Sequence, residues 1–424
     1  MSSITRLKGF QDVLTEDRRY WDFIIHTATQ LAHRFAFQRL DVPVIEETSL
    51  FARGVGTASD FFVNKEMYTI AEEDGESITL RPEFTAGVVR AYLQNGLHNL
   101  PQPVKLFTFG PIFRRERPQA GRFRQHSQFD CEILGETDPA ADLEVMMLAM
   151  SLYREMGYSE LGFQLNSTGC PVCKPVYVKA LTEYLADHLD KLNAIDQERL
   201  RLNPLRILDS KEAGMTELLA NAPHIVNHLC DDCASHFAEL RGMLDALGQS
   251  YTINFRLVRG IDYYTKTVFE VWDQRIGAQA ALCGGGRYDG LAEAIGGQST
   301  PGVGFGLGME RAVLGLKQEG ITPPATPEPA VFIAHFGGAT KSAAVSLLYQ
   351  LRAEGIGARL AFGRERRSLK SQMREANKYP IRYVIILGED EVARGEATVR
   401  PLNETDGQQF AMPLADLAGW LKEK

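Results

Sequence analysis

The order of apolar and polar positions predicts a mixed α+β fold for most of the chain. Apolar residues recur at helical spacing between Trp21 and Phe35. We expect a helix there, with Thr15 as its N-cap ahead of an acidic first turn. Strand-like runs then dominate, with helices between them, which is typical of an antiparallel sheet flanked by helices. These runs are VKLFTFG, PIFR, QHSQFDCEIL, TVFEVW, AALC and VGFGLG, and residues 177–248 predict a helical insertion.

The last quarter of the chain shows a different pattern. The segment Ile321 to Ala330 holds four prolines and no hydrophobic periodicity, as a linker does. After it, the runs VFIAHF, ARLAF and YVIIL alternate with two helical patterns, so we expect a small α/β domain with a largely parallel sheet. The expected domains are therefore residues 1–322, with a helical insertion at about 170–250, a linker at 323–330, and residues 331–424.

Composition and charge limit the partners. The 424 residues contain no apolar run near the roughly 18 residues of a membrane span, and the N-terminus lacks the apolar stretch of a secretory signal, so we expect a cytoplasmic protein that does not enter membranes. The net charge of -8 argues weakly against nucleic acid. Between Arg359 and Arg382, however, the chain has eight basic residues and only two acidic ones. This excess suits an RNA partner that binds and dissociates, and a solvated helix face is the alternative.

The densest chemistry lies between Phe113 and Gly135. Five arginines (114, 115, 117, 122 and 124) surround a Pro-Gln-Ala-Gly turn, and guanidinium groups bind phosphates with two parallel hydrogen bonds. The return strand then alternates polar and mostly apolar residues, which gives it one polar face. We interpret this hairpin as a phosphate clamp beside a ligand cleft; a solvated edge hairpin is the alternative. The polar positions are His126, Gln128, Asp130 and Glu132.

Two further patterns suggest a ligand site. Glycine fills every second position from Gly302 to Gly308, so one face of that strand has no side chains. A flat group such as a nucleotide base, or a closely packed helix, would fit there, and Arg311 in the next helix could reach a phosphate. Glu83 and Thr85 mark a strand-to-helix junction, where Thr85 is either a cleft residue or a helix cap.

Four of the six cysteines form two CxxC pairs, Cys170 with Cys173 and Cys230 with Cys233. Two such pairs fit a structural zinc site with four thiolates, provided that the fold brings them together. Reduced cysteines without a metal are the alternative. The nearby His224, His228 and His236 are expected on helix surfaces, and Cys131 and Cys283 in the core or a pocket lining.

Taken together, these segments resemble the histidyl-tRNA synthetases, a class II aminoacyl-tRNA synthetase family. LVRGIDYY (257–264) and CGGGRYDGL (283–291), in this order between the arginine hairpin and GLGMER, are highly specific to the family, and the resemblance runs nearly end to end. It implies a six-stranded antiparallel catalytic sheet with flanking helices and an α/β anticodon-binding domain. Pro43 resembles the proline of the first class II motif, which implies a homodimer.

The resemblance also implies the reaction. Histidine and ATP, accompanied by Mg²⁺, would form histidyl-adenylate and pyrophosphate, and tRNA(His) would then accept the histidyl group with release of AMP. A non-catalytic relative, the regulatory subunit of an enzyme of histidine biosynthesis, is the alternative function. Such relatives lack the anticodon domain and parts of the catalytic set, whereas Arg114, Arg259 and Arg311 are all in place here.

By the same resemblance each site residue has an expected role. Arg114 and Arg259 are the catalytic residues, acting on the α-phosphate. The ATP-binding residues are Arg114, Glu116, Arg122, His126 and Arg311. The histidine-binding residues are Glu83, Thr85, Gln128, Glu132, Arg259, Tyr264 and Tyr288. Two positions depart from the family pattern: His126 stands where an aromatic residue often stacks on adenine, and Thr15 where a proline is common.

Overall fold

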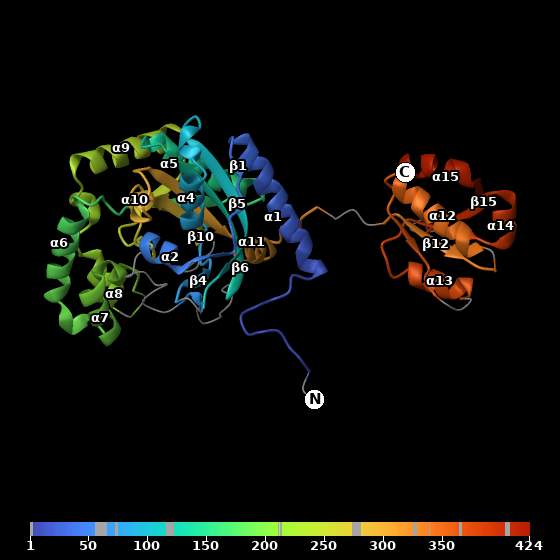
Figure 1. Ribbon diagram of the computed structural model, residues 1–424, viewed down its shortest axis with the longest axis horizontal. Helices are drawn as coiled ribbons and strands as arrows, with labels where there is room; N and C mark the ends of the chain where they lie inside the picture. The colour runs from blue at the N-terminus through green and yellow to red at the C-terminus, as the bar shows by residue number, and fades with distance from the viewer. Residues whose placement is uncertain are drawn as a thin grey trace. The chain divides into compact units, whose positions relative to one another are not determined.

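The computed structural model describes residues 3–55, 66–72, 75–115, 123–210, 212, 214–273, 281–324, 329–338, 340–363, 367–402 and 408–424. The contacts between Cα atoms divide the chain into two compact units, Met1–Pro324 and Ala325–Lys424. Figure 1 shows the elements of both units along the chain. In the described part of the chain, no helix combines the length and the hydrophobicity needed to cross a lipid bilayer.

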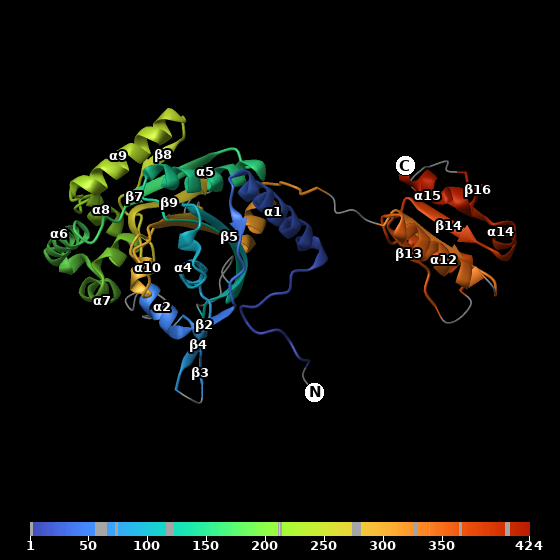
Figure 2. The same cartoon turned by 45° about the horizontal axis from the view of Figure 1, so that its top comes forward.

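A twisted sheet of eight strands forms the centre of the N-terminal unit (Figure 2). Its six central strands are antiparallel, as the sequence predicts, while short strands at both edges pair in parallel with their neighbours. The runs VKLFTFG and PIFR form one continuous strand rather than two. In sheet order, the strands are β1 (Gln38–Arg39), β5 (Val104–Phe113), β6 (Gln125–Leu134), β11 (Gly302–Gly308), β10 (Ala281–Arg287), β9 (Thr265–Asp273), β7 (Leu161–Ser167) and β8 (Tyr251–Ile253).

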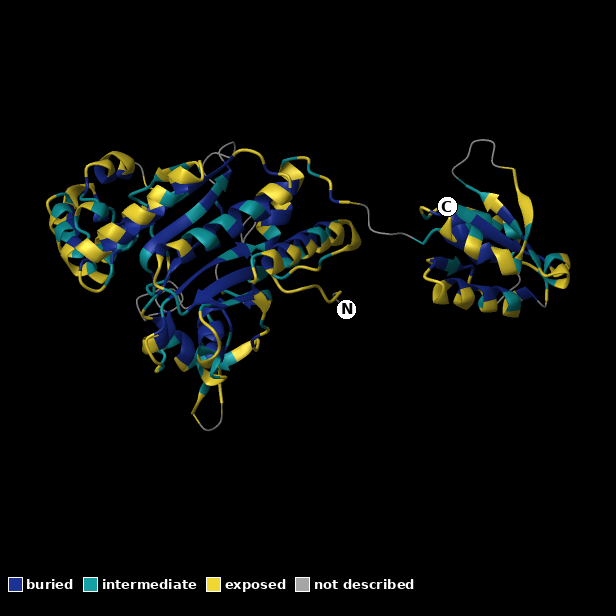
Figure 3. Ribbon diagram, turned by 90° about the horizontal axis from the view of Figure 1, so that it is seen from above, coloured by how far each residue is buried: buried dark blue, intermediate teal, exposed yellow. Residues whose placement is uncertain are grey.

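One face of this sheet is covered by helices and forms the main core, which appears as the dark blue strands of Figure 3. The apolar residues of β6, Phe129, Cys131 and Ile133, all lie in this core, which confirms the predicted alternation. The covering helices are α1 (Thr15–Arg34), α5 (Pro139–Glu155), α9 (Asp231–Ala246) and α11 (Met309–Gln318). The prediction for Thr15 was wrong: it is the first residue of α1, Leu14 is the N-cap, and no side chain caps this end.

The opposite face of the sheet is only partly covered. Helices α4 (Thr85–Gln94) and α10 (Leu291–Ala294) pack over its β5 edge, together with Tyr288. Beside them lie α2 (Thr48–Gly54), the 3-10 helix η1 (Leu97–Asn99) and a small sheet of β2 (Ile45–Glu47), β4 (Ser77–Leu80) and β3 (Tyr68–Ala71). The polar side of β6 is therefore left facing a cleft instead of a helix.

Helices fill the chain between β7 and β8 and form a small core of their own, which includes Tyr177, Leu181 and Ile207. They lie together at one side of the unit, coloured green in Figure 1. Because the chain leaves β7 and returns to β8, which pairs with β7, both ends of this insertion are fixed to the sheet. Its elements before α9 are α6 (Lys174–Ala186), η2 (Leu189–Lys191), α7 (Ala194–Leu202), η3 (Pro204–Asp209), α8 (Met215–Ala220) and η4 (Ile225–Asn227).

The C-terminal unit has a five-stranded sheet in the order β13-β12-β14-β15-β16. The three predicted strands are present and parallel: β12 (Val331–His335), β13 (Ala358–Leu360) and β14 (Tyr383–Leu387). The antiparallel strands β15 (Glu396–Pro401) and β16 (Phe410–Pro413) were not predicted, because both are short and carry polar residues and proline. The helices are α12 (Thr340–Ala353), α13 (Leu369–Ala376), α14 (Glu389–Arg394) and α15 (Leu414–Lys422).

Candidate active site

A polar cleft opens on the partly covered face of the sheet. Seven of the predicted site residues line it: Glu83, Thr85, Arg114, Gln128, Arg259, Tyr264 and Tyr288. They come from the start of α4, the ends of β5 and β6, the segment 257–264 and the turn after β10, so the fold gathers residues far apart in sequence. The cleft also includes Asp130, Ile261, Tyr263, Gly284, Gly304, Phe305 and Gly306.

Glu132 does not line the cleft itself but lies behind Thr85 and Tyr288, which do, and it is almost completely buried. Its carboxylate accepts hydrogen bonds from the hydroxyl groups of Thr85, at 2.7 Å, and of Tyr288. Burial raises the pKa of Glu132 to about 8, although these two hydrogen bonds act to lower it. The Thr85 hydroxyl thus belongs to the cleft and does not cap α4, which settles the alternative left open by the sequence.

Three buried oxygens of the cleft have no hydrogen-bond partner among the described residues: Glu83 Oε2, Gln128 Oε1 and Asp130 Oδ1. Glu83 uses its other oxygen to accept the backbone amide of Ala86, at 3.0 Å, in the first turn of α4. Burial raises the pKa of Glu83 and raises that of Asp130 well above its usual value, with Glu132 and Glu83 adding repulsion at Asp130. An unpaired buried polar atom costs about 1–3 kcal/mol, so this arrangement fits a ligand rich in N–H donors.

Two arginines border the cleft. The Nε atom of Arg114 donates to the carbonyl oxygen of Pro82, at 2.9 Å, which fixes the base of its guanidinium. Arg259 donates to Glu270 at 2.8 Å, and Glu270 also accepts the indole N–H of Trp272. Burial acts to lower the pKa of Arg259, but Tyr264 and Glu270 outweigh it and the pKa is raised. Arg259 is therefore a fixed cation beside the carboxyl groups of the cleft.

The glycine face of β11 lies close to side chains of the protein itself, and Gly304 and Gly306 also line the cleft. A Cβ atom at Gly304 would lie 1.6 Å from the Glu132 carboxylate, and one at Gly302 would lie 2.3 Å from the Tyr288 ring. Gly306 approaches Asp130 in the same way, at 3.0 Å. These glycines therefore make room for the protein's own cleft side chains, and only at Gly308 is the space open enough for another group.

The structure gives fewer contacts for the other four residues predicted to bind ATP. Arg311 lies in the first turn of α11, as expected, and is exposed, while His126 lies on β6 with its Nδ1 atom 3.2 Å from the carbonyl oxygen of Phe123. Neither lines the cleft. Glu116 and Arg122 fall outside the described residues. The roles of these four in binding ATP stay predictions.

Sequence reasoning assigned no role to three residues of the site. Asp130 was seen on the polar face of β6 but was given no ligand. Tyr263 lines the cleft and its ring packs against those of Tyr264 and Tyr288, with centroids 4.8 and 5.6 Å away. Glu270 holds Arg259 from β9, and the only sequence signal for it is a lone acidic residue within the apolar strand run TVFEVW.

A second buried charged cluster lies within the same unit. Asp142 of α5 accepts hydrogen bonds from Arg287, at the end of β10, and lies 3.2 Å from the Nε2 atom of His236 on α9. Both Arg287 and Asp142 are fully buried, and burial acts to raise the pKa of Asp142, but His236 and Arg287 lower it. The prediction that His236 lies on a helix surface was therefore wrong, because it pairs with a carboxylate in the core.

The fold does bring the two CxxC pairs together. The four sulfur atoms of Cys170, Cys173, Cys230 and Cys233 all lie within 4.8 Å of one another, whereas none of the three nearby histidines joins this cluster. Cys131 and Cys283 are buried elsewhere, as expected.

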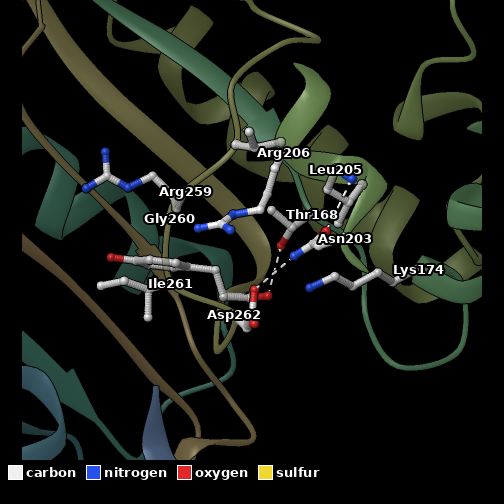
Figure 4. A pocket seen from close by; sticks show the side chains of 11 residues that line it. Thr168, Lys174, Asn203, Leu205, Arg206, Arg259, Gly260, Ile261 and Asp262 are labelled. Atoms are coloured by element: carbon white, nitrogen blue, oxygen red, sulfur yellow. Dashed lines mark hydrogen bonds between the residues drawn. The ribbon is translucent and has the colours of Figure 1, made fainter. Parts of the chain in front are cut away.

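A second pocket lies beside the cleft (Figure 4). Arg259 and Tyr264 line both the pocket and the cleft. On the insertion side, Lys174 extends toward Asp262, and Asn203 donates to the same carboxylate at 3.3 Å. The segment 257–264 therefore lies between the insertion and the cleft and contacts both.

Comparison with known proteins identifies relatives over the whole chain. Residues 9–312 match the family model of histidyl-tRNA synthetase, and residues 330–424 match that of an anticodon binding domain. The histidine–tRNA ligase of Desulforamulus reducens is 46% identical over 420 residues, which cover 99% of each chain. That of Pelotomaculum thermopropionicum is also 46% identical, over 99% of this chain and 98% of its own. A crystal structure of apo histidyl-tRNA synthetase from S. aureus has a TM-score of 0.81 at 33% identity, covering 99% of this chain and 100% of its own.

Proposed function

The chain belongs to the histidyl-tRNA synthetase family, and we propose that the polar cleft beside β6 is where it joins histidine to ATP. Like its relatives, it is an aminoacyl-tRNA ligase that attaches L-histidine to tRNA(His) at the expense of ATP. The relatives match it from end to end, and an anticodon binding domain is present, which argues against a regulatory subunit.

Two of the three unpartnered oxygens of the cleft support the proposal for histidine. Glu83 Oε2 and Gln128 Oε1, with Thr85 beside them, would accept the three N–H bonds of an α-ammonium group. Glu132 and Tyr264, with Tyr288, would bind the imidazole, which offers one donor and one acceptor when neutral. An apolar amino acid would leave the buried polar groups of the site without hydrogen-bond partners, so the site rejects it strongly. This arrangement therefore supports selectivity for histidine.

The chemical step would take place between the two arginines. The carboxylate of histidine attacks the α-phosphorus of ATP, and pyrophosphate leaves. Arg114 would hold the α-phosphate, and Arg259 would stabilise the negative charge that grows on it as the fifth bond forms. Arg259 suits this role because Glu270 fixes its guanidinium before the substrates arrive. Arg122, Arg311 and Glu116 would bind the outer phosphates, which bring Mg²⁺ with them.

The adenylate then transfers its histidyl group to tRNA(His), and the C-terminal unit is proposed to bind the anticodon. Within the predicted basic segment, Arg359 stacks on Tyr379 at 4.0 Å and Arg367 pairs with Glu375 at 2.5 Å, so both have internal roles. Lys370, Arg374 and Lys378 are exposed at four-residue intervals on and just after α13. They form the proposed RNA contact.

Four further assignments complete the proposal: the domain bounds, the location, the oligomeric state and the metal. Residues 1–322 form the catalytic domain, 323–330 the linker and 331–424 the anticodon-binding domain. The protein acts in the cytoplasm as a homodimer, with Pro43 at the dimer interface. The four clustered cysteines hold a structural zinc ion.

Exchange of pyrophosphate into ATP tests the proposal directly. With each amino acid in turn and no tRNA, the purified chain should catalyse exchange only with histidine. Arg259→Ala should lose about 100- to 1,000-fold of that rate, as removal of a group that stabilises transition-state charge does. A folded protein that binds histidine but supports no exchange would instead favour the regulatory function.

A further inference from the structure

The four cysteines lie at the boundary between the insertion and the catalytic sheet. Cys170 and Cys173 follow β7, whereas Cys230 and Cys233 stand at the start of α9. The cluster therefore joins the two ends of the insertion, on either side of its own small core. A crosslink here would fix the insertion to the sheet independently of that core.

The distances fit a tetrahedral metal ion. The sulfur of Cys170 lies 3.7 Å from those of Cys173 and Cys230. Four sulfurs placed about 2.3 Å from a zinc ion in a tetrahedron lie about 3.8 Å apart. A disulfide would require about 2.05 Å, and all four residues are free thiols. The spacing thus matches ligands around a shared ion more closely than it matches a disulfide.

The backbone is also arranged to support thiolates. The amide of Cys170 donates to the sulfur of Cys173 at 3.1 Å, and the amide of Val172 donates to that of Cys170 at 3.4 Å. Gly169, with a φ of +67°, allows the tight approach, because a Cβ atom there would lie 2.8 Å from the Cys173 sulfur. Amide donors aimed at the sulfurs stabilise the negative charge that zinc ligands carry.

The same loop is hydrogen-bonded to the histidine cleft. Thr168 and Gly169, next to Cys170, exchange two backbone hydrogen bonds with Lys266, at 2.7 and 2.8 Å. The hydroxyl of Thr168 donates to the backbone carbonyl of Tyr264 at 3.1 Å. From the other cysteine pair, Asp232 forms an ion pair with the Lys266 ammonium at 2.9 Å. Lys266 itself has a φ of +51°, a conformation that its surroundings must hold in place.

From these contacts we propose that the four cysteines bind one zinc ion, and that this ion positions the segment 257–266 of the histidine cleft. The ion would hold both ligand loops; the first contacts the backbone of Tyr264 and Lys266, and the second contacts the Lys266 side chain. Lys174, directly after Cys173, reaches the same segment through the pocket of Figure 4. The positioning role rests on the proposed function, because it assumes that Tyr264 and Arg259 bind histidine; the metal site itself does not.

Metal content tests the site without reference to catalysis. The full chain, purified without an affinity tag and dialysed into metal-free buffer, should retain one zinc per chain. After removal of zinc, added Co²⁺ should give the intense absorption of a tetrahedral thiolate complex. Cys230→Ser with Cys233→Ser should lose both signals. Protein that retains no zinc and binds neither added Zn²⁺ nor Co²⁺ would overturn the proposal and leave the cysteines as simple thiols.

Steady-state constants test the positioning role. Removal of zinc with a chelator should raise the KM for histidine in pyrophosphate exchange about 10-fold or more, and leave the KM for ATP nearly unchanged. Thr168→Val should keep the metal and raise the KM for histidine about 2- to 10-fold, the effect of one lost hydrogen bond. Lys179→Ala, in an exposed pair on α6, is the matched control and should change neither constant.

The outcomes separate the two proposals. If the protein binds zinc but its removal does not change the KM for histidine, the positioning role is overturned. Failure of the zinc-loaded wild-type chain to exchange pyrophosphate with histidine would instead overturn the proposed function. Circular dichroism of the chelated protein shows whether a loss of activity comes from the cleft or from unfolding of the insertion.

Discussion

Two clusters of buried charged residues lie in the same catalytic unit and differ in how completely they are paired. Around Asp142, Arg287 and His236 supply partners for the carboxylate, and the pKa of Asp142 is lowered. Around Glu83 and Asp130, three oxygens have no partner among the described residues, and both pKa values are raised. The polar groups of the first cluster are hydrogen-bonded without a ligand. In the second cluster the unpaired oxygens lower the stability of the fold, and a ligand that pairs with them would remove this loss. This difference supports a structural role for the first cluster and the proposed binding role for the second.

The largest effect should come from breaking the complete cluster. Arg287→Met leaves Asp142 buried next to His236 alone and should destabilise the fold by about 3–5 kcal/mol, measured by urea unfolding. Adding Asp142→Leu should recover much of this loss, because it removes the uncompensated charge. Should Arg287→Met unfold at the wild-type urea concentration, the cluster would not be structural.

The same kind of change in the open cleft should leave the fold intact. Glu83→Gln removes a buried carboxylate whose second oxygen has no partner, so the midpoint of urea unfolding should stay the same or rise. The KM for histidine should rise by about 10- to 100-fold, since the variant loses a charged hydrogen bond to the ammonium group. A drop in stability without loss of histidine binding would reverse the assignments of the two clusters.

The pH dependence of stability should differ between wild type and Glu132→Gln. Glu132 has a pKa of about 8 in the fold, above its ordinary value of 4.5, so the folded state binds the proton more tightly than the unfolded chain does. Its contribution is fully present below pH 4.5 and is lost as the pH rises toward 8, at up to about 1.4 kcal/mol per pH unit. Thermal unfolding of both proteins from pH 5 to 8 should show a steeper fall in wild type; parallel curves would contradict the raised pKa.

Removing exposed charges of the C-terminal unit should have the smallest effect. It should change the binding of tRNA and not the stability of the fold or the formation of the adenylate. Lys370→Ala with Lys378→Ala should raise the KM for tRNA a few-fold and reduce its dependence on salt. Pyrophosphate exchange, which needs no tRNA, should not change. An unchanged KM for tRNA would mean that this face of α13 is only solvated. Lys341→Ala, at another basic position of the C-terminal unit, provides the comparison.

Much of the cleft could be predicted because its signals are local. Alternation along β6 identified the polar face that carries Gln128 and Glu132, and the strand-to-helix junction marked Glu83. The pairing of Arg287 with Asp142 could not be predicted in this way, since the two residues are 145 positions apart. His236 sits on a helix whose pattern does not reveal the carboxylate opposite it. The alternating glycines of β11 predicted that another group packs closely against the strand, but not which group it is.

The approach of Gly304 to Glu132 also limits how the protein can change over generations. A single methyl group at position 304 would fall 1.6 Å from the Glu132 carboxylate, so Ala, the smallest replacement, would displace Glu132. A residue larger than glycine can be accommodated at position 304 only where position 132 carries a smaller side chain. Since two coordinated substitutions arise far more rarely than one, this packing tends to preserve glycine at position 304.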